Sequence, residues 1–194
     1  MAAAAGRIGP NALLQLAPVL EARGGRALRE RVFLAGGVDA LPSEDGLMDE
    51  APAGAVHRAL RRLLPGDAPE IAAEAGRRTG DYILAHRIPA LAQRVLRLLP
   101  PALAARLLTR AIAQHAWTFA GSGRFRVASV SPPVFEIGDN PITRGERAAA
   151  PVCHWHAAVF ERLFSELVHP GATCVESSCS AAGDGVCRFE LRWR

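Results

Sequence analysis

All four cysteines of this 194-residue chain lie in its last quarter. Cys153 stands alone, Cys174 and Cys179 bracket the run Cys-Val-Glu-Ser-Ser-Cys, and Cys187 follows eight residues after Cys179. Three thiolates and one carboxylate suit the tetrahedral coordination of Zn²⁺. We therefore predict a zinc site made by Cys153, Glu176, Cys179 and Cys187, provided that the fold brings these side chains together.

A hairpin near the carboxyl end would supply most of that convergence. Residues 172–177 and 186–193 read as strands, and the run Ser-Ala-Ala-Gly-Asp-Gly at 180–185 predicts the turn between them. Cys179 and Cys187 then flank one loop. In the returning strand the apolar residues alternate with charged ones, so Cys187 should face the core.

A helix opened by Pro151 should carry Cys153 in its first turn. The positive end of the helix dipole stabilises a thiolate there, which is the form that a metal ion binds. His156, one turn later, is the rival of Glu176 for the fourth coordination position. Cys174 has no place in the set of four and is either a bystander or a competing ligand.

Two other uses of the cysteines are open. Four cysteines also permit two disulfides, and small buried thiols need no function at all. The first ten residues lack the basic and apolar regions of a secretory signal, so we expect a cytoplasmic protein with reduced thiols. The metal site is the interpretation that we favour.

The positive charge of the chain is carried by arginine alone. Its 23 basic residues are all arginine and stand against 19 acidic ones, which gives a net charge of +4. The arginines are scattered without interleaved aromatic residues, a pattern that argues against nucleic acid as a partner. No apolar run is long enough to span a bilayer, although the helices rich in leucine and arginine could rest on one. We expect at most peripheral contact with a membrane.

Helical periodicity dominates the first 120 residues, and strand patterns follow at 124–130, at 134–137 and in the last hairpin. The expected helices begin near Asn11, Arg26, Val56, Pro69, Pro89, Ala102 and Pro151. Helices first and strands late predict an α+β fold, with N-terminal helices packed on a C-terminal antiparallel sheet of two hairpins. We expect one domain over 1–194, helical over about 10–120 and holding the sheet and metal site over 121–194.

Two helical patterns indicate either a ligand or close packing. His115 falls on the apolar face of the expected helix 102–119, where a histidine is either a satisfied core residue or a ligand. Gly76 and Gly80 lie four residues apart in the helix after Pro69. Glycine costs on the order of 1 kcal/mol in a helix interior, so this pair indicates close approach by another backbone or by a flat ligand.

The ligand spacing resembles a known family. The positions of Cys153, Glu176, Cys179 and Cys187, with the run Cys-Arg-Phe at 187–189, resemble the 4-vinyl reductase domain. That small-molecule-binding domain is also the sensory module of phenol-responsive transcription activators. In those sensors the residues that match all four positions bind zinc.

Two longer runs are similar to one branch of that family, the bacteriochlorophyll biosynthesis protein J branch. They are His-Ala-Trp-Thr-Phe-Ala-Gly-Ser-Gly at 115–123 and Val-Cys-His-Trp-His-Ala-Ala-Val-Phe at 152–160. The resemblance covers nearly the whole chain. It implies a fold like that of the phenol sensors and of vesicle-tethering subunits, related more distantly to heme-based nitric oxide sensors, and usually a homodimer.

The resemblance also implies a large apolar pocket between helices and sheet, with a chlorophyll-pathway tetrapyrrole as its ligand. We expect this pocket to be lined by His115, Trp117, Phe119, Phe125 and His156, with arginines at the rim to meet propionate groups. One of the histidines could ligate Mg²⁺ axially.

The family name implies reduction of the 8-vinyl group of a chlorophyll precursor. Hydride transfer needs a redox cofactor, and the sequence has neither a dinucleotide fingerprint nor an iron–sulfur cysteine set. A zinc ion with four protein ligands is redox-silent and closed. We therefore favour a binding protein without catalytic residues, a carrier or chaperone that presents a Mg-porphyrin or divinyl protochlorophyllide to the bacteriochlorophyll pathway enzymes.

Two alternatives to the carrier stay open. The first is the 8-vinyl reductase itself or one of its subunits. The second is a zinc-containing sensor domain for a small aromatic compound, although the sensors carry downstream ATPase and DNA-binding domains for which this chain has no segment.

Overall fold

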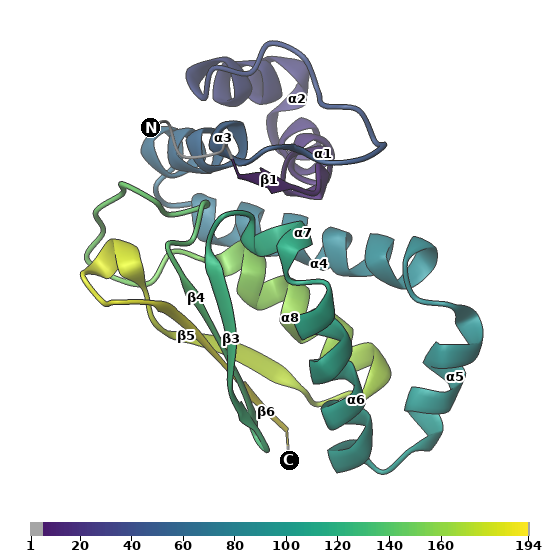
Figure 1. The fold of residues 1–194 in the computed structure, drawn as a ribbon. Helices are drawn as coiled ribbons and strands as arrows, with labels where there is room; N and C mark the ends of the chain where they lie inside the picture. The colour runs from purple at the N-terminus through teal and green to yellow at the C-terminus, as the bar shows by residue number, and fades with distance from the viewer. Residues whose placement is uncertain (1–5, 194) are drawn as a thin grey trace.

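A four-stranded antiparallel sheet forms one layer of the molecule, and helices cover its apolar face (Figure 1). The computed structural model describes residues 6–193. The strands are β3 (Arg124–Val130), β4 (Pro133–Gly138), β5 (Thr173–Ser178) and β6 (Cys187–Arg192), in the spatial order β3-β4-β6-β5. The predicted α+β fold with two hairpins is confirmed.

The two hairpins are joined into one sheet by β4 and β6. Phe135 lies opposite Phe189, and Ile137 lies opposite Cys187. These four side chains are fully buried, because strand alternation turns them toward the helices. The start of β6 at Cys187 therefore lies in the core beside β4.

The other elements surround this sheet. They are β1 (Arg7–Ile8), α1 (Asn11–Leu14), α2 (Leu16–Ala35), β2 (Met48–Asp49), α3 (Glu50–Leu63), α4 (Ala68–His86), α5 (Ala90–Leu98), α6 (Pro101–Gln114), α7 (Trp117–Ala120), α8 (His154–Leu167) and the 3₁₀ turn η1 (Ser180–Ala182). Helices α1 to α3 gather at one end with the short β1–β2 ribbon, and α5 and α6 extend to the other (Figure 1). A non-helical backbone at Gly24 and Gly25 divides α2 where the sequence predicts two helices.

Helix α8 lies between the sheet and α4. The indole N–H of Trp155 on α8 donates to Thr79 Oγ1 on α4 at 3.2 Å. A Cβ added at Gly76 would lie 2.4 Å from the carbonyl oxygen of Trp155, and one added at Gly80 would lie 2.7 Å from Arg162 Cβ. The close approach that the glycine pair indicates is therefore made by a neighbouring helix.

Helix α3 begins at Glu50, six residues before the predicted start at Val56. Glu50 is buried, and its carboxylate accepts hydrogen bonds from the backbone N–H and the hydroxyl of Ser122 at 2.7 and 2.5 Å. Arg144 pairs with the same carboxylate at 2.5 Å. These remote partners fix the first turn of the helix, and none of them is visible in the local sequence.

The helix predicted over 102–119 ends at Gln114. The chain turns at His115 and Ala116, and His115 Nδ1 lies 2.9 Å from the carbonyl oxygen of Ala111, a side-chain bond that competes with the helical ladder. The prediction that His115 lies on a buried face is wrong, because this turn directs its side chain to solvent.

Aromatic rings fill the space between α7, α8 and the sheet. Phe119 packs edge-to-face on Phe125 and Phe160, with ring centroids 5.3 and 5.7 Å apart, and Phe135 lies 5.0 Å from Phe160. With His156 these rings form what we call the aromatic cluster. It occupies the region where the sequence predicts an apolar pocket.

Candidate metal centre

Separate chain segments bring the four predicted metal ligands together. Cys153 is the N-cap residue of α8 rather than a member of its first turn, Glu176 lies in β5, Cys179 precedes η1, and Cys187 begins β6. Their ligand atoms all lie within 4.8 Å of one another. The convergence that the spacing predicts is therefore present in the folded chain.

The sulfur atoms are spaced as a tetrahedral site requires. Cys187 Sγ lies 3.5 Å from Cys153 Sγ and 3.8 Å from Cys179 Sγ. A tetrahedron with Zn–S bonds of about 2.3 Å has edges of about 3.8 Å. All four cysteines are free thiols, so the disulfide alternative is not what the structure contains.

The centre is closed to solvent. Cys153, Cys179 and Cys187 are 0% exposed. Glu176 Oε2 accepts a hydrogen bond from the backbone N–H of Cys153 at 2.6 Å, whereas its buried Oε1 has no hydrogen-bond partner among residues 6–193. A buried carboxylate oxygen without a partner is costly, and a cation held between it and the sulfur atoms would satisfy it.

The four groups do not share negative charge evenly. Hydrogen bonds from Cys153 and Cys179 lower the pKa of the Cys187 thiol, whereas burial raises the pKa of Cys153. Burial also raises the pKa of Glu176 to about 7. Without a metal the centre thus accepts one thiolate and resists further negative charge, while a divalent cation would stabilise every anionic ligand.

Polar side chains around the sulfur atoms were missed by sequence reasoning. The Asn140 amide donates to Cys153 Sγ at 3.3 Å. The hydroxyls of Ser180 and Thr143 lie 3.4 and 3.7 Å from Cys187 Sγ. Such partners orient metal ligands and tune their basicity. The Asn-Pro pair at this position predicts only a turn, and nothing local shows that this loop folds over Cys153.

Cys174 and His156 lie outside the centre. Cys174 is buried on β5, and its backbone N–H donates to Glu161 Oε2 at 2.9 Å. His156 is buried, and its ring lies 5.8 Å from that of Phe189. Burial lowers the pKa of His156 to about 4. Glu176, rather than its rival His156, is therefore the fourth member of the cluster.

The five residues predicted to line a ligand pocket fall into two groups. His115 and Trp117 lie at the surface near the break between α6 and α7, and Trp117 is 55% exposed. Phe119, Phe125 and His156 belong to the aromatic cluster, where the Phe119 and His156 centroids are 6.2 Å apart. The structure thus brings three of the five together, in packed rather than open surroundings.

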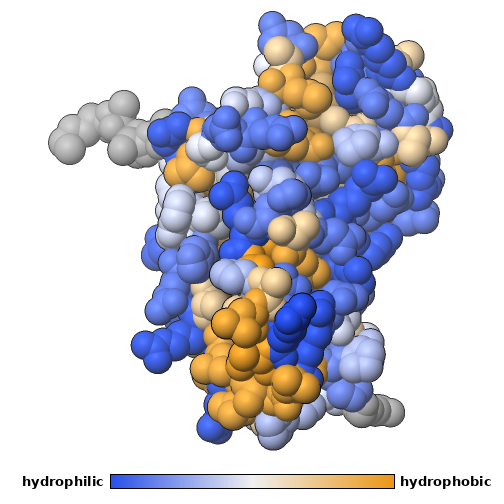
Figure 2. Space-filling model, turned by 90° about the vertical axis from the view of Figure 1, so that its right-hand side faces the viewer, coloured by the Kyte–Doolittle hydropathy of each residue, from blue (hydrophilic) through white to orange (hydrophobic). Residues whose placement is uncertain are grey.

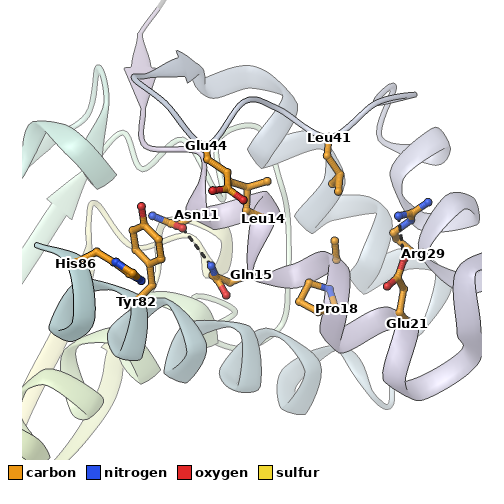
Figure 3. Close-up of a pocket in the computed structure, with 11 residues that line it drawn as sticks. Asn11, Leu14, Gln15, Pro18, Glu21, Arg29, Leu41, Glu44, Tyr82 and His86 are labelled. Carbon is orange, nitrogen blue, oxygen red and sulfur yellow. Dashed lines mark hydrogen bonds and ion pairs between the residues drawn. The ribbon is translucent and has the colours of Figure 1, made fainter.

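A cavity of about 420 Å³ lies elsewhere, between α1, α2 and α4 (Figure 3). Tyr82 and His86 of α4 line it with ring centroids 4.7 Å apart. Asn11 and Gln15 line it from the α1 side and are joined by a hydrogen bond of 3.3 Å (Figure 3). Helical spacing places Tyr82 and His86 on one face, but only the tertiary fold sets α1 opposite them.

Comparison with known proteins identifies the family. The model of the 4-vinyl reductase domain matches residues 133–193, a range that contains all four members of the centre. The bacteriochlorophyll synthase 23 kDa chain of Cereibacter sphaeroides is 55% identical over 189 residues, which cover 97% of this chain and 92% of that protein. The chain belongs to this family. The protein of the same name from Rhodobacter capsulatus is 52% identical over 186 residues, which cover 95% of this chain and 86% of that one.

These matches confirm the resemblance found in the sequence. Solved structures of H-NOX proteins share the fold: one from K. algicida has a TM-score of 0.64 at 8% identity, and one from S. oneidensis has 0.60 at 7%. Each match covers 96% of this chain, with 97% and 99% of the respective neighbours. A third, from a study of heme distortion in the H-NOX family, has 0.57 at 10% identity and covers 96% of this chain and 95% of that one. Within residues 6–193, no helix combines the length and apolarity needed to cross a bilayer.

Proposed function

We propose that this chain binds a tetrapyrrole intermediate of bacteriochlorophyll synthesis, a Mg-porphyrin or divinyl protochlorophyllide, and carries it to the enzymes of that pathway. The proposal is carried by the 55% identity, over 97% of the chain, to a protein named as a chain of bacteriochlorophyll synthase. The fold neighbours support the ligand class, because one of those H-NOX structures was solved to probe heme distortion, and heme is also a tetrapyrrole.

The metal centre has a structural role in this proposal. Cys153, Glu176, Cys179 and Cys187 would hold Zn²⁺, for which three thiolates and a carboxylate at these separations are suitable ligands. Four protein ligands leave no open position for a substrate. A held ion would fasten the start of α8 to the β5–β6 loop.

The seat that we propose for the tetrapyrrole is the cavity between α1, α2 and α4. Its volume falls in the range of small-molecule sites, and it is already open, whereas the aromatic cluster would have to unpack. Tyr82 offers a flat aromatic face and His86 an exposed imidazole that could ligate magnesium. Leu14 adds an apolar wall.

Titration with magnesium protoporphyrin tests this function. The Soret band should shift and sharpen with saturation, and serum albumin provides the reference for nonspecific uptake. His86→Ala and His115→Ala form a matched pair of exposed histidines, one in the cavity and one in the site predicted from sequence. We expect His86→Ala to weaken binding by about tenfold or more, and His115→Ala to leave it unchanged.

The opposite result from the two variants would move the seat to the α6–α7 region. Phe119→Ala tests the aromatic cluster in the same assay, since opening that cluster should change the affinity only if the ligand enters it. Affinity no better than that of albumin, with none of the variants having an effect, would contradict the tetrapyrrole-binding function.

A catalytic subunit is the second candidate, favoured by the word synthase in the names of the two relatives. A subunit of this kind would take part in altering the tetrapyrrole, whereas a carrier returns it unchanged. The fate of the bound pigment therefore separates the two functions.

A further inference from the structure

Helices α5 and α6 turn large apolar side chains outward. On α5, Leu91, Val95 and Leu98 are 73%, 47% and 86% exposed, and this helix has no buried residue. On α6, Leu103 and Leu107 are 44% and 45% exposed, while the buried residues of α6 face the rest of the molecule. We call these five side chains the α5–α6 patch.

The patch is continuous rather than scattered. Leu91, Val95 and Leu98 follow the i, i+4, i+7 spacing that places side chains on one side of a helix. Figure 2 shows a dense hydrophobic area at the lower end of the molecule, on the side where Figure 1 places α5 and α6, with strongly hydrophilic residues beside it. Contiguous exposed apolar areas mark interaction surfaces.

The charge around this patch has one sign. Between Asp81 and Glu136 the sequence contains no acidic residue. The same stretch contains the arginines at positions 87, 94, 97, 106, 110, 124 and 126. A segment of this length with cationic and apolar residues alone is suited to an anionic, partly apolar partner.

Most arginines of the two helices are available for such a partner. Arg97 is engaged, because its guanidinium lies 3.6 Å from the carboxylate of Glu166 on α8. Arg94, Arg106 and Arg110 are exposed, and no ion pair holds any of them within the described residues 6–193. They lie on the outward side of the same helices as the patch.

We propose that the α5–α6 patch seats the protein on the surface of an anionic lipid bilayer. Leucine side chains would enter the boundary between headgroups and acyl chains, and the guanidinium groups would meet lipid phosphates. A second copy of this chain fits the patch poorly, because it would bring two arginine-bearing faces together. The inference goes beyond the carrier function and requires no bound tetrapyrrole.

Sedimentation of the full-length protein with vesicles tests this proposal. One set contains equal parts of phosphatidylcholine and phosphatidylglycerol, and the other contains phosphatidylcholine alone. We expect binding to the mixed vesicles at low salt, about tenfold weaker binding to the neutral ones, and progressive loss as salt is added. The double variant Leu91→Ser/Leu98→Ser should lower the partition coefficient by at least about tenfold, and Arg94→Glu/Arg110→Glu should remove the preference for anionic lipid.

The matched control is Leu34→Ser/Val175→Ser, which removes two apolar side chains that are each 61% exposed outside the patch. It should bind vesicles like the unmodified protein. Equal binding to both vesicle types, or an equal loss in the control, would overturn the proposal. So would light scattering that shows a dimer dissociated by Leu91→Ser/Leu98→Ser together with no vesicle binding, because the patch would then be covered by a second copy.

Discussion

Cys187 holds the central position among the sulfur atoms of the metal centre. Two thiols and the Ser180 hydroxyl surround its Sγ within 3.8 Å, so the first negative charge of the site is stabilised there. Burial opposes the ionisation of Cys153 and Glu176. A bound cation would remove that opposition, and its binding free energy would become part of the free energy of folding.

Cys179→Ser and Cys187→Ser should each abolish zinc binding and lower the free energy of unfolding by about 4 kcal/mol or more. Cys174→Ser is the control, because Cys174 is a buried cysteine outside the cluster and should leave the zinc content unchanged. Metal analysis and denaturant unfolding of freshly purified, reduced protein measure both quantities. A zinc-free native protein, or loss of zinc in the control, would contradict the assignment.

His57 connects the stability of the N-terminal helices to pH. It is fully buried in α3, and its Nε2–H donates to the carbonyl oxygen of Ala12 at 3.1 Å. Burial lowers its pKa from 6.5 to about 3. Between these values the unfolded chain takes up a proton that the folded chain does not, so the stabilisation is present above pH 6.5 and is lost as pH falls toward 3.

The slope should reach about 1.4 kcal/mol per pH unit just below the unfolded pKa, and His57→Gln should make it shallower while keeping a donor for Ala12. Denaturant unfolding between about pH 5 and 8 measures it. Above about pH 7 both histidine forms are neutral, so the variant should differ from the native protein by a constant amount there. Identical slopes in both proteins would refute this account of His57.

At the scale of the element, the packing of α4 against α8 is the contact that a single methyl group should disturb. Gly76→Ala favours the isolated helix but places a Cβ 2.4 Å from the Trp155 carbonyl oxygen. The steric cost should win and lower the free energy of unfolding by about 1–3 kcal/mol. Gly66→Ala is the control, because its Cβ would meet no atom within 4 Å. A neutral or stabilising Gly76→Ala in thermal unfolding would show that the two backbones are further apart.

Elements that are bounded by turn residues could be predicted from the sequence. The strands at 124–130 and in the last hairpin match β3, β5 and β6 within one residue at nearly every end. The ligand set could be predicted too, because Glu176, Cys179 and Cys187 belong to one hairpin. The end of α6 could not, since it depends on a side chain of His115 that competes with the helix ladder.

The remaining features depend on segments far apart in the chain. Asn140 reaches Cys153 only because its loop folds back over the start of α8. The cavity at Tyr82 and His86 exists only because α1 packs near α4, more than 60 residues away in sequence. Periodicity reports which face of an element is apolar, but not which element will cover it.

At the scale of the whole molecule, the three functional features lie apart. The metal centre joins the sheet to α8, the cavity lies among the N-terminal helices, and the α5–α6 patch lies at the other end (Figure 1). A carrier needs this separation, because a protein resting on a bilayer through α5 and α6 would keep its cavity accessible to other enzymes.

The fate of a bound pigment tests the carrier function most directly. Purified protein is incubated with divinyl protochlorophyllide and either NADPH or reduced ferredoxin, passed over a gel-filtration column, and the pigment is then resolved by chromatography. The carrier function predicts that the pigment elutes with the protein and still has both vinyl groups. Monovinyl product formed without any added enzyme, or pigment that elutes free of the protein, would contradict it.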